Sequence, residues 1–432
     1  MKIFGLLQTL LLLVIKRITN DDTYWYKDHN GIRWKCSPVY DADGKVVTGQ
    51  AEITSAKGCG TEVEVPGTVC DIKGVAYTVV KLSKVFCENT ELQKVTLPTS
   101  VTILDGTFYG CTALTTVENT SQISKIGKKT FQKTAITSID LPACTTVEDW
   151  AFRDCKALTS IDLPVCTTVG GGAFSACAAL PSVNLPACVT MGEHAFEGCT
   201  GLTSIDLPLC KTVGEHAFRD CTNLASIDLP SCTEVGYCAF SGCTALESAN
   251  IPLCTLVEYS AFEDCSRLRS INLPSCKLVE FSAFYGCTIL SSIKMPLCMD
   301  VGINAFEYCE GLTSVELPWC SSVGDFAFAG CVALTSVDLT LCTTIGFEAF
   351  SDCTSLAHIK IPSDVAYIGN FAFSNCAGLN RIDVYWNTPL RIDAYVFKKV
   401  DEQKCTLYVP KGTYLDYRNA VGWGEFENII ER

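Results

Sequence analysis

The chain has 432 residues, of which 48% are hydrophobic and 19% are charged, a balance that excludes a disordered chain. The formal net charge of −14 argues against nucleic acid and anionic membranes as partners, since both require a basic surface. The length exceeds what one ordinary core uses, although a repeat array can lengthen its core unit by unit.

An apolar run from Ile3 to Ile15 follows Lys2 at the start of the chain. The run is too short to span a bilayer and has the length of a signal-peptide core. We therefore predict a signal peptide over residues 1–20 and a secreted or cell-surface location. Lys16 and Arg17 depart from the usual pattern, which leaves an uncleaved anchor or a misplaced start as alternatives. No later segment is predicted to cross a membrane.

Residues 21–80 carry the signals of β-hairpins. Segments of alternating polarity, such as Tyr24 to Tyr26, are separated by the dipeptides Asn30-Gly31 and Asp43-Gly44. The open end of a repeat array would be an adhesive edge, so its terminal units must differ from the middle. We predict a β-rich N-terminal cap.

Residues 81–400 repeat with a period of 22, which one phenylalanine marks in each unit. A fixed period of this length is typical of a solenoid, in which each unit stacks only on its neighbours. The marker phenylalanines are Phe86, Phe108, Phe131, Phe152, Phe174, Phe196, Phe218, Phe240, Phe262, Phe284, Phe306, Phe328, Phe350, Phe373 and Phe397.

One unit, residues 202–221, shows how each coil is built. Ile205 and Leu207 alternate with polar residues, as in a half-buried strand. Pro208 ends the strand because it has no N–H to donate. Gly214 is predicted to permit the tight corner between the two arms of the coil.

The 28 cysteines follow the same period. Equivalent thiols would stack about 4.8 Å apart, slightly too far for a disulfide. We predict buried unpaired thiols and no metal site or cofactor; systematic disulfides are the alternative. Any disulfide is expected among Cys36, Cys59, Cys70 and Cys87, which precede the regular array. The two periodic series run from Cys144 to Cys342 and from Cys155 to Cys353.

The full motif reads L-x-S-I-x-L-P-x-C-x-x-V-G-x-x-A-F-x-x-C and resembles the bacterial leucine-rich repeat of BspA-like surface proteins. The resemblance covers residues 80–399. It implies a right-handed leucine-rich-repeat coil of about fifteen turns, mostly β and irregular, with short parallel strands and caps at both ends. Residues 401–432 resemble the C-terminal cap of such proteins from Bacteroidetes-type bacteria and predict a strand, a turn and a short helix.

Two histidines offer the one candidate for metal chemistry. His194 and His216 are equivalent positions in adjacent coils, and Glu193 and Glu215 precede them. Two imidazoles and two carboxylates about 5 Å apart along a solenoid could bind a divalent metal. The simpler interpretation is a pair of exposed polar neighbours that was duplicated with its coil.

An acidic row is predicted at the outward position of successive strands. Stacked carboxylates repel one another, and Lys294 and Lys360, which interrupt the row, are expected to compensate. The row could bind calcium or a basic partner, or it could be a solvated strand face. Its aspartates are Asp140, Asp162, Asp206, Asp228 and Asp338.

A stripe of apolar residues stands three places before the marker phenylalanine. Its members are Tyr237, Tyr259, Phe281, Ile303 and Phe347. Other coils have charged or polar residues at this position, so the core does not require an apolar group there. If exposed, the stripe is a contact site for a protein or glycan; otherwise it packs within the wall of the solenoid.

These patterns predict a non-enzymatic binding protein, monomeric and secreted or displayed on the cell surface. Members of the family that it resembles are associated with adhesion to host matrix proteins and to other cells, which implies host matrix or cell-surface proteins, or glycans, as partners. A structural role in assembly of the cell envelope is one alternative. A metal-dependent enzyme that uses His194 and His216 is another.

Overall fold

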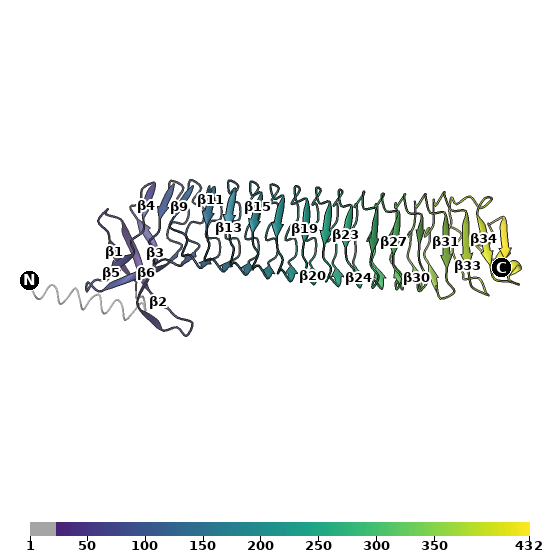
Figure 1. The fold of residues 1–432 in the computed structure, drawn as a ribbon, viewed down its shortest axis with the longest axis horizontal. Helices are drawn as coiled ribbons and strands as arrows, with labels where there is room; N and C mark the ends of the chain where they lie inside the picture. Colours follow the sequence, from purple (N-terminus) through teal and green to yellow (C-terminus); the bar gives the residue numbers. More distant parts are fainter. Residues whose placement is uncertain (1–22) are drawn as a thin grey trace, which may run out of the picture.

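The computed structural model describes residues 23–432 and takes the form of a long rod (Figure 1). The predicted signal peptide at residues 1–20 lies outside the described residues. Short parallel strands from successive coils stack in two walls, which confirms the predicted solenoid. Among the described residues there is a single α-helix, α2 (Tyr414–Arg418), near the C-terminus. No helix of residues 23–432 is long and apolar enough to cross a bilayer.

The first wall uses the Ser-x-Asp segment of each coil. It divides into five short parallel sheets rather than one, with breaks after β9, β17, β23 and β29. The strands are β4 (Glu62–Glu64), β7 (Lys94–Thr96), β9 (Thr116–Glu118), β11 (Ser138–Asp140), β13 (Ser160–Asp162), β15 (Ser182–Asn184), β17 (Ser204–Asp206), β19 (Ser226–Asp228), β21 (Ser248–Asn250), β23 (Ser270–Asn272), β25 (Ser292–Lys294), β27 (Ser314–Glu316), β29 (Ser336–Val337), β31 (His358–Ile361), β33 (Arg381–Val384), β34 (Thr406–Val409) and β35 (Asn428–Glu431).

The second wall is one continuous parallel ladder. Its strands are β6 (Ala76–Ser83), β8 (Ile103–Asp105), β10 (Lys125–Ile126), β12 (Thr146–Val147), β14 (Thr168–Val169), β16 (Thr190–Met191), β18 (Thr212–Val213), β20 (Glu234–Val235), β22 (Leu256–Val257), β24 (Leu278–Val279), β26 (Asp300–Val301), β28 (Ser322–Val323), β30 (Thr344–Ile345) and β32 (Tyr367–Ile368).

The N-terminal hairpins extend this second wall. Strands β1 (Tyr24–Lys27), β2 (Arg33–Tyr40) and β3 (Val46–Lys57) pair antiparallel in that order. Strand β3 then pairs parallel with β6, which pairs parallel with β8; β5 (Thr68–Cys70) lies antiparallel to β6. The first coil therefore adds to a sheet that already exists, and its strand edge is covered.

The marker phenylalanines form one column inside the rod. Consecutive rings from Phe86 to Phe397 stack with centroids 5.0–5.7 Å apart, a spacing suited to offset aromatic stacking. The rings from Phe108 to Phe350 are fully buried. The column fixes the register of each coil on the next.

The periodic cysteines serve as buried hydrogen-bond donors. The Cys177 thiol donates to the carbonyl oxygen of Phe152 in the preceding coil at 3.1 Å, and Cys210 donates to that of Thr212 at 3.3 Å. Both sulfurs lie in the core, and every described cysteine carries a free thiol. A thiol fills space as a small apolar group does, yet it also satisfies a buried carbonyl.

Gly214 does not form the corner that the sequence predicts. Its φ is not positive; the left-handed residue is instead His216, at φ 54°. A Cβ atom on Gly214 would lie 2.6 Å from the carbonyl carbon of Gly192 in the preceding coil. Between two glycine-bearing coils the backbones come close enough for a side chain at Gly214 to collide with the preceding coil, whereas Glu148, Glu258 and Glu280 occupy the equivalent position in other coils.

Aromatic residues close the C-terminal end of the rod. The Trp423 ring packs 5.4 Å from the last marker, Phe397. Its indole nitrogen donates to the carbonyl oxygen of Leu390 at 2.8 Å, and the Tyr417 hydroxyl donates to that of Trp386 at 2.9 Å. Strands β34 and β35 pair in parallel beyond β33, so the first wall continues past the fifteen predicted coils.

Candidate binding surfaces

The predicted aromatic positions lie at the corner that follows each strand of the second wall. Tyr237, Tyr259, Phe281 and Ile303 are between 40% and 47% exposed, so they do not pack within the wall. Phe347 is half-buried. Its ring meets those of Phe326 and Phe371 edge to face, at 5.2 and 5.9 Å.

Sequence reasoning missed five further members of this surface. They stand two places before the marker phenylalanine instead of three, and they occupy the left-handed or adjoining position of the same corner. His216 lies edge to face with Tyr237 at 4.9 Å, and Phe371 stacks on Tyr395 at 5.4 Å. We call the whole set the aromatic stripe: His194, His216, Tyr237, Tyr259, Phe281, Ile303, Phe326, Phe347, Phe371 and Tyr395. Reading both positions of the corner together would have revealed it.

The histidine pair is not arranged as the metal site that stood as the alternative interpretation. The rings of His194 and His216 stack face to face at 4.7 Å, and nitrogen lone pairs lie in the ring planes, so they do not converge. His194 Nδ1 lies 2.9 Å from Glu197, while Glu193 and Glu215 are exposed. Within residues 23–432, no three His, Cys, Asp or Glu side chains group as metal ligands.

The surroundings of the His216 imidazole favour its neutral form. Burial, and then the charge of His194, lower the pKa of its imidazole below the ordinary value. Its Nδ1 atom is buried without a hydrogen-bond partner among the described residues. The pair therefore acts as two stacked rings at one end of the aromatic stripe.

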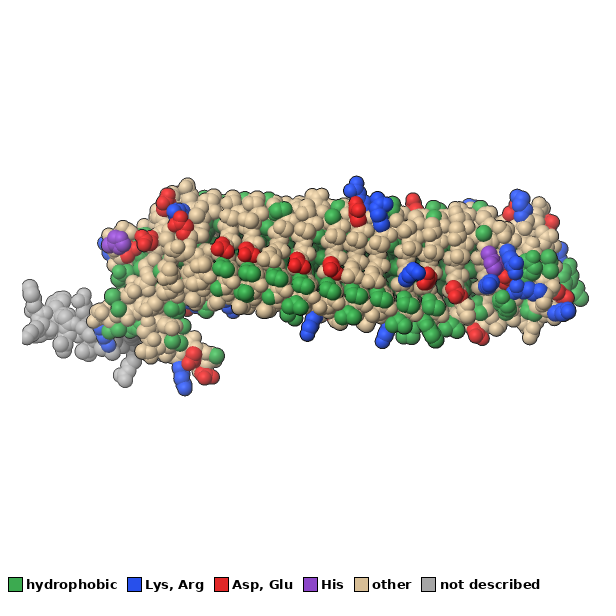
Figure 2. All heavy atoms as spheres, in the orientation of Figure 1, with side chains coloured by type: hydrophobic (Ala, Val, Ile, Leu, Met, Phe, Trp, Pro, Cys, Tyr) green, Lys and Arg blue, Asp and Glu red, His purple; other side chains and the backbone are tan. Residues whose placement is uncertain are grey.

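The five aspartates of the predicted acidic row are exposed on the first wall, along the face seen in Figure 2. Amide side chains separate many of the carboxylates. Asn184 donates to Asp162 at 2.9 Å, and Asn250 donates to Asp228 at 2.8 Å. These bonds relieve the repulsion that a run of bare carboxylates would feel.

The other charged residues of the acidic row differ in their neighbours. Lys294 forms an ion pair with Glu316 at 2.8 Å, as its place in the row predicts. Asp206 and Asp228 stand on β17 and β19, which lie side by side without strand pairing, as β23 and β25 do at Asn272 and Lys294. Asp140 and Asp162 are the aspartates that stand directly opposite in a paired register. This arrangement is that of a solvated strand face.

A second exposed surface was not predicted. Figure 2 shows a band of hydrophobic side chains along the rod, beside the acidic row. Large apolar residues follow the strand-ending proline, or its equivalent, in several coils and are 42–59% exposed. We call them the apolar band: Val165, Leu209, Leu253, Leu297, Trp319 and Leu341. The signal in the sequence was the residue between proline and cysteine, which varies between coils and is written as x in the repeat motif.

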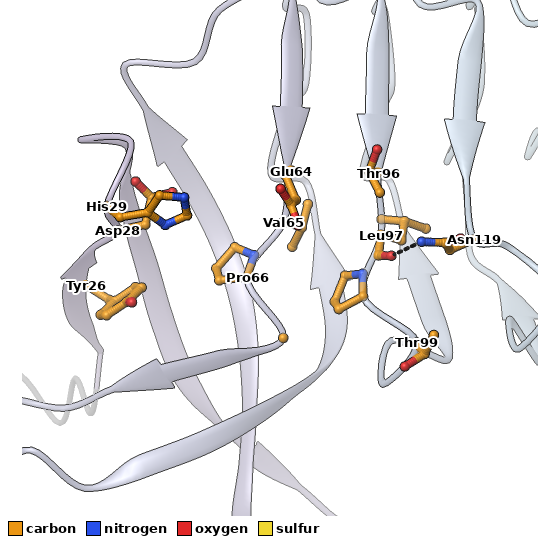
Figure 3. Close-up of a pocket in the computed structure, with 12 residues that line it drawn as sticks. Tyr26, Asp28, His29, Glu64, Val65, Pro66, Thr96, Leu97, Thr99 and Asn119 are labelled. Atoms are coloured by element: carbon orange, nitrogen blue, oxygen red, sulfur yellow. Dashed lines mark hydrogen bonds between the residues drawn. The ribbon is translucent and has the colours of Figure 1, made fainter.

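A small hollow of about 350 Å³ lies between the β1–β2 hairpin and the first coils (Figure 3). Its half-buried acid, Asp28, already accepts hydrogen bonds from Ile32 N and Trp34 Nε1, both at 2.9 Å. Asn119 donates to the carbonyl oxygen of Leu97 at 3.0 Å. The bonds of Asp28 stay within the β1–β2 hairpin, and that of Asn119 joins two coils, so these polar groups already have partners.

Comparison with known proteins matches the description "BspA type Leucine rich repeat region" in six copies, over residues 81–202, 189–298 and 277–404. A leucine-rich repeat protein from Bacteroides ovatus is 24% identical, with 90% of this chain and 99% of that one covered and a TM-score of 0.59. A leucine-rich cell surface protein from Faecalibacterium prausnitzii is also 24% identical, over 93% of this chain and 98% of that one, with a TM-score of 0.45. No protein with a curated description matches the sequence.

Proposed function

Because the chain belongs to the family of BspA-type leucine-rich repeat proteins, we propose that it is a non-enzymatic binding protein that works outside the cell. That membership confirms the resemblance read from the repeat. The proposed partners are host matrix or cell-surface proteins, or glycans, and the proposed location is secreted or on the cell surface.

The aromatic stripe is the observation that carries this proposal. Its central members project from a rigid corner that repeats in every coil, so binding requires little ordering of the protein. Aromatic side chains dominate the energetics of protein interfaces and also stack on sugar rings. Four neighbouring coils present such groups where other coils carry charged residues. A partner bound along the stripe would contact several coils at once.

The test is a binding screen of the purified full-length protein against immobilised matrix proteins, a glycan array and whole cells. The double substitution Tyr259→Ser and Phe281→Ser should weaken saturable binding at least about tenfold, because it removes two exposed rings from the centre of the stripe. Trp319→Ser, which removes a still more exposed ring from the apolar band, is the control and should change little.

Two results would count against the proposal. Absence of saturable binding to every partner class would remove the binding function itself. Binding that survives the double substitution and is lost on Trp319→Ser would move the contact to the apolar band.

The apolar band favours one second candidate, a structural role in which copies of the protein assemble side by side. Exposed apolar residues at one position of several coils would suit lateral contact between rods. Sedimentation velocity over rising concentration separates the two functions. A monomer at all concentrations favours the first, whereas assembly that Leu253→Ser and Leu297→Ser abolish favours the second.

A further inference from the structure

A cluster of basic side chains surrounds one buried carboxylate at the C-terminal end of the first wall. The Asp383 side chain is 0% exposed. It lies 2.6 Å from His358 Nε2, 3.1 Å from Arg381 Nε and 3.0 Å from a terminal nitrogen of Arg432. Burial on its own would raise the pKa of Asp383, but the hydrogen bonds and charges of these three residues outweigh burial and lower it. One fixed negative charge thus anchors three basic side chains.

The guanidinium groups of Arg381 and Arg432 also contact tyrosine rings. Arg381 lies 4.4 Å from the ring centroid of Tyr408, and Arg432 lies 4.8 Å from that of Tyr385. Both separations suit cation–π contacts. The Nε of Arg381 donates to the carboxylate of Asp383. Its terminal nitrogens donate to no other described residue. The cluster keeps unused positive charge.

Lys360 adds a further cation beside the cluster. It stands opposite Asp383 in the register of β31 and β33, and it is exposed. Lys294 occupies the equivalent position three coils earlier and is paired with Glu316, whereas Lys360 forms no ion pair within residues 23–432. Figure 2 shows these basic side chains gathered around a histidine near the C-terminal end of the visible face. On a chain of net charge −14, this island attracts anions that the rest of the rod repels.

A hollow of about 690 Å³ lies next to the cluster, within the size range of small-molecule sites. Its lining is mixed, with hydroxyl groups and one aromatic ring beside the apolar side chains of Val337, Leu339 and Pro362. It includes Ser336, Asp338, Thr340, His358, Lys360 and Tyr385. The hollow therefore combines the basic residues His358 and Lys360 with hydroxyl groups and the carboxylate of Asp338.

We propose that this hollow binds an acidic sugar, that is, a saccharide with one carboxylate. Lys360 holds the carboxylate, with the His358 ring, which is bonded to Asp383 through Nε2, beside it. Asp338 accepts from Thr340 N and Oγ1 through Oδ1, at 3.0 and 2.6 Å, and offers Oδ2 to the sugar hydroxyls. The face of the Tyr385 ring that Arg432 leaves uncovered packs against the sugar. An acidic peptide fits less well, since Asp338 would repel a second carboxylate but accepts hydrogen bonds from hydroxyl groups. The site is separate from the aromatic stripe, so either can hold or fail alone.

The experiment titrates the full-length protein with methyl β-glucuronide and, as the neutral match, methyl β-glucoside, with chemical-shift changes as readout. The glucuronide should bind at least about tenfold more tightly, because only it offers a charge-assisted contact. Lys360→Gln should remove most of that difference. Lys294→Gln, the same substitution in the same row, should leave binding unchanged.

Both lysines are exposed, so neither substitution should unfold the chain, and an unchanged melting temperature checks this. Equal binding of the two sugars, or full binding by Lys360→Gln, would overturn the proposal. Acetate or sulfate bound as tightly as the glucuronide would show a general anion site and overturn the assignment to a sugar. Tighter binding of a glutamate-rich tripeptide would overturn it in favour of an acidic peptide.

Discussion

At the scale of single residues, glycine sets how closely neighbouring coils approach. A Cβ atom added to Gly214 would meet the backbone of Gly192 at 2.6 Å, and one added to Gly324 would meet that of Gly302 at 2.7 Å. These contacts are with backbone atoms of the preceding coil, which cannot rotate away as a side chain can. A side chain at one of these glycines would have to push two coils apart, although the ladder keeps its register where Glu258 and Glu280 occupy the equivalent position.

Substitution of this glycine should destabilise the protein. Gly214→Ala is expected to lower the free energy of unfolding by about 2 kcal/mol, since the added methyl group forces two coils apart. Urea denaturation followed by circular dichroism measures the change. Gly60→Ala is the control, because a Cβ atom there meets nothing within 4 Å and its φ is not positive. Equal stability of the two variants would disprove the close-approach role.

At the scale of the strand, the first wall depends on which side chains stand opposite one another. Asn250 donates to Asp228 and accepts from Asn272, so one amide links three coils. Replacing it with an acid would put carboxylates on adjacent strands of a paired sheet. Asp140 and Asp162 already stand directly opposite on paired strands, without an amide between them.

Asn250→Asp should therefore weaken the wall in a salt-dependent way. We expect a loss of about 1 kcal/mol at low ionic strength, the Coulomb energy of two exposed charges at this separation. Most of the loss should disappear in concentrated salt, which screens exposed charges. Denaturation midpoints at the two salt concentrations provide the measurement. A loss that salt does not reduce would show that the amide acts through shape and not charge.

The repeat pattern predicted the features that recur in every coil. It did not predict features that depend on contacts between coils or with the C-terminal cap. Phe240 could be placed in the core because its period repeats without interruption. The role of Gly214 could not, because it depends on a backbone in the preceding coil. The site around Asp383 was invisible because Arg432 reaches it from the far end of the chain, outside any repeat. Whether a side chain such as Tyr259 faces solvent also required the geometry of the corner.

At the scale of the whole molecule, the buried thiols make stability depend on alkaline pH. Burial raises the pKa of Cys188 and of Cys199 to about 12, from an ordinary value of 9.0. Between these values the unfolded chain releases thiol protons and the folded chain keeps them. Stability is therefore complete below about pH 9 and falls as the pH rises toward 12.

The number of thiols makes this loss steep. Each one costs about 1.4 kcal/mol per pH unit above its unfolded pKa. About ten of them at pH 10 would cancel the ~5–15 kcal/mol that stabilises a typical domain. We expect cooperative unfolding near pH 10, detected by far-ultraviolet circular dichroism together with the rise of thiolate absorbance. A folded signal that persists while the thiolate absorbance rises would contradict it.

The direction of the backbone hydrogen bonds has a mechanical consequence. In both walls these bonds join one coil to the next, so they run along the axis of the rod. Tension applied to the two ends therefore opens them a few at a time, like a zipper, and does not shear a whole sheet at once. Each coil that unspools gives up about 4.8 Å of rod and releases roughly 70 Å of chain. A tether built in this way would absorb a sudden load by lengthening stepwise while its remaining coils stay intact.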